Sequence, residues 1–192
     1  LSFTTSAVSG SSTSAAATFG TLPTGATSIT AKVFNASTGG TQVGSTVTGY
    51  SSGTALTGLT GNTTYYIELT AIGGVDYNDI TFTRVAVTTN LTAQVKPTVT
   101  STSGTYGTAL TLASGGGSGN GAVTYSTNTA GCSIAGTGPY TISSTSAQTC
   151  VVTATKAAEG IYSSATSDAT NVVFATRPIT PKAVVKIEVS KC

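Results

Sequence analysis

The chain has 192 residues, which suits two domains of roughly 90 to 100 residues, each large enough to bury a core of its own. Charged residues make up 7% of the sequence, far below the roughly 25% usual in soluble proteins, and the net charge of +2 comes from scattered basic residues that exclude a nucleic-acid-binding patch. The sequence contains no histidine, which excludes Ser-His-Asp and Cys-His catalysis and imidazole-bound zinc.

Segments rich in Thr, Val, Ile and Tyr alternate with turns of Gly, Ser, Asn and Pro about every eight to twelve residues, a spacing typical of all-β sandwiches. No helical periodicity extends beyond a turn or two. The first half predicts strands over Ala15–Phe19, Ser28–Asn35, Thr41–Val47, Ala55–Leu59, Thr64–Ile72 and Ile80–Thr88. The second half predicts strands over Val95–Thr100, Ala109–Ala113, Ala122–Ser126, Pro139–Ser143, Thr149–Lys156 and Thr170–Ala175.

A domain boundary is expected within Thr88–Pro97, where an alternating strand ends and Pro97 interrupts the donation of hydrogen bonds to a sheet. The sequence therefore predicts two tandem immunoglobulin-like β-sandwich domains, over residues 1–90 and 91–176, followed by a connector and an extra strand over residues 177–192.

The segment GLTGNTTYYIELTAIGG (residues 58–74) follows a turn with alternating apolar and polar residues. Its apolar side chains lie on one face of an extended strand and are expected to face a core: Leu59, Tyr65, Ile67, Leu69 and Ala71. This pattern resembles the E–F corner and the F strand of a fibronectin type III domain, and the resemblance covers residues 1–90. It implies that Tyr65 is the corner tyrosine, whose hydroxyl bonds to upstream backbone. The tryptophan usual on strand B is missing, and Phe19 is the expected substitute.

Residues 106–167 resemble one unit of the bacterial immunoglobulin-like repeats of secreted surface proteins. The resemblance is carried by a glycine-rich turn before a VTY strand, by two cysteines and by the late segment CVVTATKAAEGIY. It implies a sandwich stapled by a cysteine pair, in a repeat that mostly serves as a spacer.

Cys132 and Cys150 flank an alternating segment, as two neighbouring antiparallel strands would. A disulfide between them would close a loop in the unfolded chain, and the chain-entropy model predicts that this stabilises the fold by about 3 kcal/mol. The alternative is two buried free thiols in a reducing cell, but the hydroxyl-rich, charge-poor composition favours the disulfide and an extracellular location. Cys192 is left over, and it is either incidental, paired with another chain, or part of a further domain.

The stretch GGVDYNDI is expected to form the F–G loop of the first domain. Asp76, Asn78 and Asp79 in this loop could gather calcium through their oxygen atoms, whereas the alternative is an Asx-rich turn that closes a hairpin. Asp76 and Asp79 are also the only close carboxylate pair, the arrangement that glycosidases need.

A ligand-binding surface would use the loops at this end of the first domain together with three tyrosines that we expect to be exposed: Tyr50, Tyr66 and Tyr77.

Three N-X-S/T triplets place candidate glycosylation sites at Asn35, Asn62 and Asn90, although a chain this rich in Ser and Thr also produces such triplets by chance.

Lys32 and Glu68 are expected to point outward from neighbouring strands, where they form either an ordinary ion pair or an isopeptide-type arrangement. Isopeptide bonds of secreted adhesins lie buried, so the outward positions favour the ion pair.

The segment RPITPKAVVKIEVSKC (residues 177–192) begins with a proline-rich connector and continues with one alternating strand. The apolar face of this strand carries Val185, Ile187 and Val189, which a lone strand cannot bury. We therefore predict an assembly strand that opens a further domain or adds to the sheet edge of a neighbouring molecule, over a disordered tail or a strand folded back.

These patterns together favour a non-enzymatic extracellular protein, secreted or at the cell surface, in which immunoglobulin-like domains act as spacer or assembly modules of a bacterial surface or filament structure. Its expected partners are copies of itself or neighbouring immunoglobulin-like domains. The alternative is an adhesin or carbohydrate-binding module that recognises a glycan or cell-surface ligand. We expect no cofactor and no metal, and the short apolar runs predict no membrane insertion.

Overall fold

The computed structural model describes residues 1–178, which contain strands, turns and bends and no helix, so no described segment forms a helix that could cross a membrane. The predicted all-β fold class is confirmed. Residues 179–192, with the expected strand carrying Val185, Ile187 and Val189 and with Cys192, lie outside the described part.

The chain divides into two compact units, and the division is not a single cut in the sequence. Unit 1 comprises Leu1–Val95 together with two later loops, Gly117–Ala122 and Lys156–Ala165. Unit 2 comprises Lys96–Gly116, Val123–Thr155 and the described part of Thr166–Cys192. The side-chain amide of Gln94 explains part of this grouping, because it donates to the carbonyl oxygens of Lys156, Ala157 and Ser163 at 2.7–3.3 Å.

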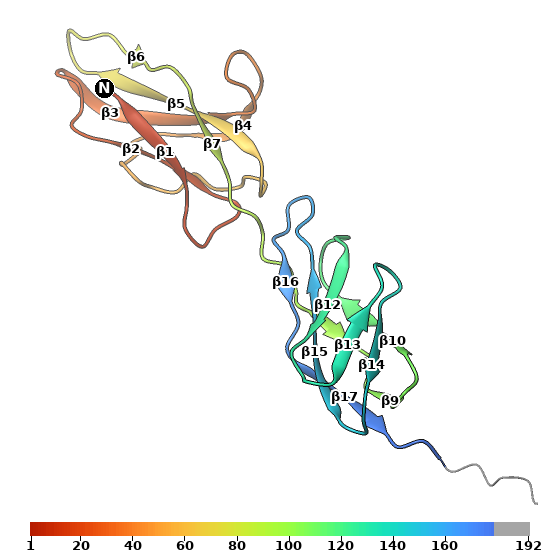
Figure 1. Cartoon of the computed structure of the whole chain (residues 1–192). Coiled ribbons are helices and arrows are strands. Elements are labelled where there is room, and N and C mark those ends of the chain that lie inside the picture. Colours follow the sequence, from red (N-terminus) through yellow and green to blue (C-terminus); the bar gives the residue numbers. More distant parts are fainter. Residues whose placement is uncertain (179–192) are drawn as a thin grey trace, which may run out of the picture. The chain divides into compact units, whose positions relative to one another are not determined.

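Unit 1 is a sandwich of two sheets (Figure 1). The larger sheet has the order β4-β3-β5-β6, and β7 also pairs with β5. Its strands are β3 (Ala26–Phe34), β4 (Gln42–Val47), β5 (Thr64–Gly73), β6 (Ile80–Thr81) and β7 (Val85–Thr88). The other sheet pairs β1 (Phe3–Ala7) with β2 (Ala15–Phe19), and a bridge from Ala15 to Leu56 adds a third segment.

The predicted inward face of β5 is the buried face. Ile67 and Leu69 are fully buried, and Leu59, Tyr65 and Ala71 are at most 6% exposed. Alternation along a strand puts every second side chain on one side, so this single strand supplies the middle of the core. The Tyr65 hydroxyl accepts a hydrogen bond of 2.9 Å from the backbone N–H of Thr60, five residues upstream.

A second tyrosine lies in this core, contrary to the expectation that Tyr50 is exposed. Tyr50 is 4% exposed, and its hydroxyl accepts a hydrogen bond from the Ala17 N–H at 2.9 Å and donates to the Thr54 carbonyl at 2.6 Å. Strand β2 presents only small alanines here, so a large side chain from elsewhere has to fill the space. Tyr50 fills this space, and the half-buried Phe19 packs against the same core with its ring centroid 6.1 Å from that of Tyr50.

Unit 2 groups its strands as an immunoglobulin-like sandwich. One sheet has the order β12-β15-β17-β9, with β16 beside β15, and the opposite side consists of β10-β14-β13 and β11-β8. The strands of the first sheet are β9 (Ser103–Thr105), β12 (Val123–Thr127), β15 (Thr149–Lys156), β16 (Ala165–Thr166) and β17 (Thr170–Ala175). The others are β8 (Pro97–Val99), β10 (Leu110–Thr111), β11 (Ser114–Gly116), β13 (Cys132–Ala135) and β14 (Thr141–Ser144). In strand letters this is the ABED and CFG grouping of immunoglobulin domains, with β9 added in parallel to β17.

Several strands differ from the sequence predictions. Strands β1, β9, β11, β13 and β16 were not predicted, because they are short and consist largely of Ser, Thr, Gly and Ala, which give little hydrophobic alternation. The predicted strand Ile80–Thr88 is interrupted between β6 and β7. The predicted strand Ala55–Leu59 contributes only the bridge at Leu56.

Replacing Tyr50 with Phe should lower the free energy of unfolding of unit 1 by about 1–3 kcal/mol, because the backbone groups of Ala17 and Thr54 lose their partner. Urea denaturation measures the loss. Tyr66→Phe is the matched control, since Tyr66 is half-buried on the outer face of β5, and its effect should stay within about 0.5 kcal/mol. Equal effects of the two substitutions would contradict the role given to Tyr50.

Burial raises the pKa of the Tyr50 hydroxyl above its ordinary value of 10.0, although the backbone hydrogen bond with Ala17 acts in the opposite direction. The folded state then holds this proton more tightly than the unfolded state. The contribution of the protonated hydroxyl to the free energy of unfolding is therefore complete below the ordinary tyrosine pKa and is lost as the pH rises through the raised pKa. The unfolding free energy above about pH 10 should therefore fall more steeply for the wild type than for Tyr50→Phe. Identical alkaline profiles would show that this hydroxyl does not titrate differently in the folded state.

Candidate functional site

The expected F–G loop of unit 1 lies between β5 and β6. Its shape comes from its own backbone: the Tyr77 N–H donates to the Gly74 carbonyl at 3.1 Å, and Asp76 adopts a left-handed φ of 71°. The carboxylate of Asp79 accepts a hydrogen bond from the Gly73 N–H at 2.9 Å. This is the local side-chain bonding that Asp favours in turns, and it uses a carboxylate that a calcium site would need. Within residues 1–178, no three His, Cys, Asp or Glu side chains gather where a metal ion could be held.

The tip of this loop displays apolar side chains. Val75 is 87% exposed and Tyr77 is 55% exposed, while Ile80 follows at the start of β6. The Tyr77 ring lies over Gly25 in the turn before β3, where an added Cβ would collide with the ring, so glycine is required at this contact. The loop therefore presents Val75 and Tyr77 on a supported turn.

The three tyrosines considered as a ligand surface do not form one. Tyr50 is buried in the core, and Tyr66 is half-buried on the outer face of β5, opposite Ala86. Tyr66 and Tyr77 also belong to opposite ends of β5, because Tyr66 lies near its first residue and Tyr77 follows its last. Of the three, only Tyr77 is available on the loops.

The three candidate glycosylation asparagines use their side-chain amides in the fold. The Asn35 amide donates to Thr41 Oγ1 at 2.9 Å and also accepts from the Thr41 N–H, which closes the turn between β3 and β4. The Asn62 amide donates to the Gly160 carbonyl at 3.0 Å. The Asn90 amide donates to the carbonyls of Val8 and Ser11 at 2.9 and 3.0 Å, so it uses both of its N–H groups. A glycan replaces one N–H of the amide, so Asn90 could not carry one and keep both bonds.

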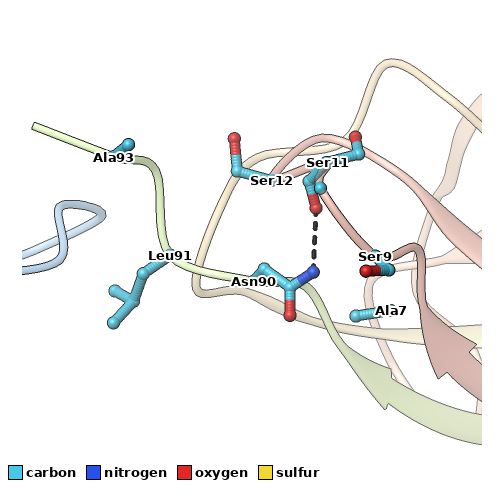
Figure 2. A pocket seen from close by; sticks show the side chains of 8 residues that line it. Ala7, Ser9, Ser11, Ser12, Asn90, Leu91 and Ala93 are labelled. Carbon is cyan, nitrogen blue, oxygen red and sulfur yellow. Dashed lines mark hydrogen bonds between the residues drawn. The ribbon is translucent and has the colours of Figure 1, made fainter.

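Asn90 also lines the hollow drawn in Figure 2. The hollow has a volume of about 590 Å³ and lies between the turn after β1 and the irregular segment that follows β7. Its lining consists of Ala7, Ser9, Gly10, Ser11, Ser12, Asn90, Leu91 and Ala93. Figure 2 shows the Asn90 amide bonded to Ser11 rather than pointing into the open space. The hollow therefore offers serine hydroxyls and one leucine but no charged side chain.

Glu68 does pair with a cation, but the cation is Arg84 and not the predicted Lys32. Lys32 and Glu68 are register neighbours on β3 and β5, yet Arg84 Nε lies 3.0 Å from Glu68 Oε2. Arg84 also donates to the carbonyls of Ala36 and Gly39, and its guanidinium carbon lies 3.3 Å from the centre of the Phe34 ring. Stacking on an aromatic ring and forked donation suit arginine better than lysine. The break between β6 and β7 brings Arg84 over this face.

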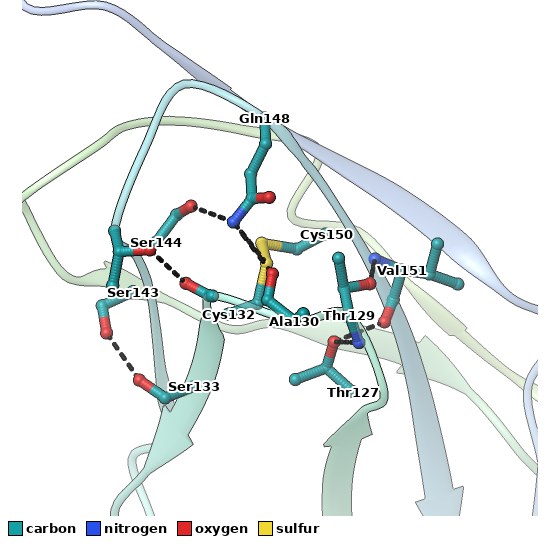
Figure 3. Close-up of a disulfide and its surroundings, with 12 residues drawn as sticks. Thr127, Thr129, Ala130, Cys132, Ser133, Ser143, Ser144, Gln148, Cys150 and Val151 are labelled. Atoms are coloured by element: carbon teal, nitrogen blue, oxygen red, sulfur yellow. Dashed lines mark hydrogen bonds between the residues drawn. A yellow bond between two sulfur atoms is a disulfide. The ribbon is translucent and has the colours of Figure 1, made fainter.

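The disulfide between Cys132 and Cys150 is present, with Cα atoms 6.0 Å apart and a sequence separation of 18 (Figure 3). The two cysteines do not lie on neighbouring strands as predicted, however, because β13 and β15 belong to different sheets. The disulfide therefore ties the two sheets of unit 2 together. Figure 3 shows the Gln148 side chain beside it, where the amide donates to the Ala130 carbonyl at 3.2 Å and to Ser144 Oγ at 3.0 Å.

No protein-family model matches the chain, and no curated protein matches it. Among solved structures, the crystal structure of murine CEACAM1b is similar, with 13% sequence identity and a TM-score of 0.49 over 91% of this chain and 100% of that chain. Similarity at this level carries no argument about function.

Removing the disulfide with Cys132→Ala and Cys150→Ala should lower the free energy of unfolding of unit 2 by about 3 kcal/mol, because the unfolded chain regains the freedom of the closed loop. Thermal or urea unfolding should show one transition shifted and the transition of unit 1 unchanged. Cys192→Ser is the control for the loss of a thiol. A variant that unfolds like the wild type would show that sheet packing alone determines the stability of unit 2.

Proposed function

We propose that this chain is a non-enzymatic extracellular structural protein, a bacterial surface or filament component whose two sandwiches act as spacer or assembly modules. The observation that carries the proposal is a set of hydroxyl pairs across the exposed faces of both units. Each pair joins two neighbouring strands at 2.8–2.9 Å: Thr64–Thr88, Thr70–Thr81, Ser126–Thr153, Ser133–Ser143 and Thr155–Thr166.

Hydroxyl pairs of this kind hold strands together without charge. Cross-strand Thr and Ser pairs stabilise a sheet by about 0.2–1 kcal/mol each, and a bond between neutral groups is neither screened by salt nor titrated near neutral pH. Proteins exposed to changing surroundings benefit from stability of this kind. Among the described residues, Arg84 forms an ion pair with Glu68 and Lys96 forms one with Asp168, and the second pair is largely exposed to solvent.

The disulfide supports the extracellular location, since disulfides persist in oxidising compartments and are rare in reduced cytosol. For unit 1 we propose a fibronectin type III relationship, which the strand grouping and the Tyr65 hydrogen bond support. For unit 2 we propose a relationship to bacterial immunoglobulin-like repeats. There the support is the sheet grouping and the glycine-rich turn ahead of β12.

A ligand-binding adhesin or carbohydrate-binding module is the second candidate function. It is favoured by the exposure of Val75 and Tyr77 at the loop tip, because an exposed aromatic ring beside a supported turn suits contact with the apolar face of a sugar. Binding on a glycan array that is lost in Tyr77→Ala and retained in Tyr66→Ala would support this function over the structural one.

The proposed function makes a prediction about solution conditions. The free energy of unfolding should vary by less than about 1 kcal/mol between low and high salt and across about pH 6 to pH 9, because few charges contribute to it. Chemical denaturation at each condition measures the variation. Electron microscopy of native material should show the chain in an ordered surface layer or fibre, and a chain found only as a dissolved monomer would contradict the structural role.

A further inference from the structure

The two sheets of unit 1 are open along one side. After β4 the chain passes the buried Tyr50, whose N–H donates to the Ile29 carbonyl of β3, and then reaches residues 53–59, which lie along β2. Leu56 exchanges backbone hydrogen bonds with Ala15 at 2.7 and 3.0 Å, the Gly53 N–H donates to the Ala17 carbonyl at 2.9 Å, and the Leu59 N–H donates to the Thr13 carbonyl at 3.0 Å. Residues 53–59 therefore form the outermost segment of the sheet that contains β1 and β2.

The outer edge of this segment has unused backbone groups. In an extended chain, successive residues direct their N–H and C=O groups to opposite sides, so Ala55 and Thr57 point away from β2. Within residues 1–178, the backbone groups of Ala55 and Thr57 have no hydrogen-bond partner. An edge of this kind is a template for another strand.

A groove runs beside this edge. It has a volume of about 290 Å³ and lies between residues 53–59 and β4, the outermost strand of the other sheet. Its apolar lining comes from Val33, Val43 and Val47 on one side and from Ala55 and Leu56 on the other. We call this groove, together with the unpaired edge of Ala55 and Thr57, the seam.

The sequence contains a segment with the features that the seam requires. Residues 183–189 alternate apolar side chains with Val184, Lys186 and Glu188. The edge that they would pair with is short, because Leu56 forms an isolated bridge and the flanking Gly53 and Gly58 have left-handed φ angles of 82° and 79°. If these residues form a strand, their apolar face would fit an aliphatic groove, and Lys186 and Glu188 would lie on the opposite face.

We propose that residues 183–189 of one copy add as a strand to the seam of a second copy. This inference rests on the proposed assembly role and names its contact. Val185, Ile187 and Val189 enter the groove, while the strand backbone pairs with Ala55 and Thr57. Because donor and acceptor are different surfaces of one chain, the contact is heterologous and continues from copy to copy as an open array.

The first test measures self-association of the full chain in a Cys192→Ser background, so that thiol pairing does not contribute. Val47→Lys in the groove and Ile187→Lys in the donor segment should each weaken association by at least about tenfold in sedimentation velocity, because both would bury an unpaired charge. Thr46→Lys is the matched control, since Thr46 does not line the groove and its hydroxyl accepts a hydrogen bond from the Gln42 side chain, and this variant should associate like the parent. Circular dichroism checks that each variant is folded, and Ile187 lies outside the described residues that build the two sandwiches.

The second test mixes two chains, one carrying Val47→Cys and the other Ile187→Cys, both with Cys192→Ser. A disulfide-linked dimer of the two different chains is the expected product. Unchanged association in both lysine variants, or no mixed dimer, would overturn the seam assignment. If the lysine variants still assemble, the seam assignment is wrong and the proposed function stands. If the native protein does not assemble at all, both the seam assignment and the proposed function are wrong.

Discussion

Each strand in this protein has two faces, and only one of them can be covered by the opposite sheet. That constraint decides which side chains form the core and which meet water. In unit 1, Ile67 and Leu69 occupy the covered face of β5, and Thr70 lies on the outer face, where it pairs with Thr81 of β6. In unit 2, Val152 and Ala154 of β15 are fully buried while Thr153 lies on the outer face. Apolar and hydroxyl side chains thus divide between the core and the surface.

Strands that obey this alternation over many residues could be predicted from the sequence. The predicted boundaries of β2, β15 and β17 are the observed ones, and the ends of β3 and β5 differ by one or two residues. Strands such as β9 and β11 carry Ser, Gly and Thr on both faces, so their position depends on pairing with distant segments rather than on a local pattern. A sequence pattern can reveal the segments that build a core, and it misses those that only complete a sheet.

The candidate site shows the same limit. Tyr50 looks like a surface residue beside Gly49 and Ser51, and only the three-dimensional neighbourhood of the β2 alanines shows why its ring is buried. The disulfide was predictable from the two cysteines, but not the fact that it joins two sheets, because topology decides which strands face each other. Arg84 could have been noticed as one of few charges in a neutral chain. Its partners Glu68 and Phe34, however, come from strands that only the fold brings together.

The disulfide of unit 2 has a mechanical meaning as well as a thermodynamic one. If the chain were pulled from both ends until the sandwich opened, the residues between Cys132 and Cys150 would stay in a closed loop and would carry none of the tension. With 18 residues excluded at about 3.4 Å each, unit 2 would lengthen by about 60 Å less than a chain without the crosslink. A surface fibre built from such units would stretch in shorter steps, and the strands of the loop would remain close to their partners when the load was released.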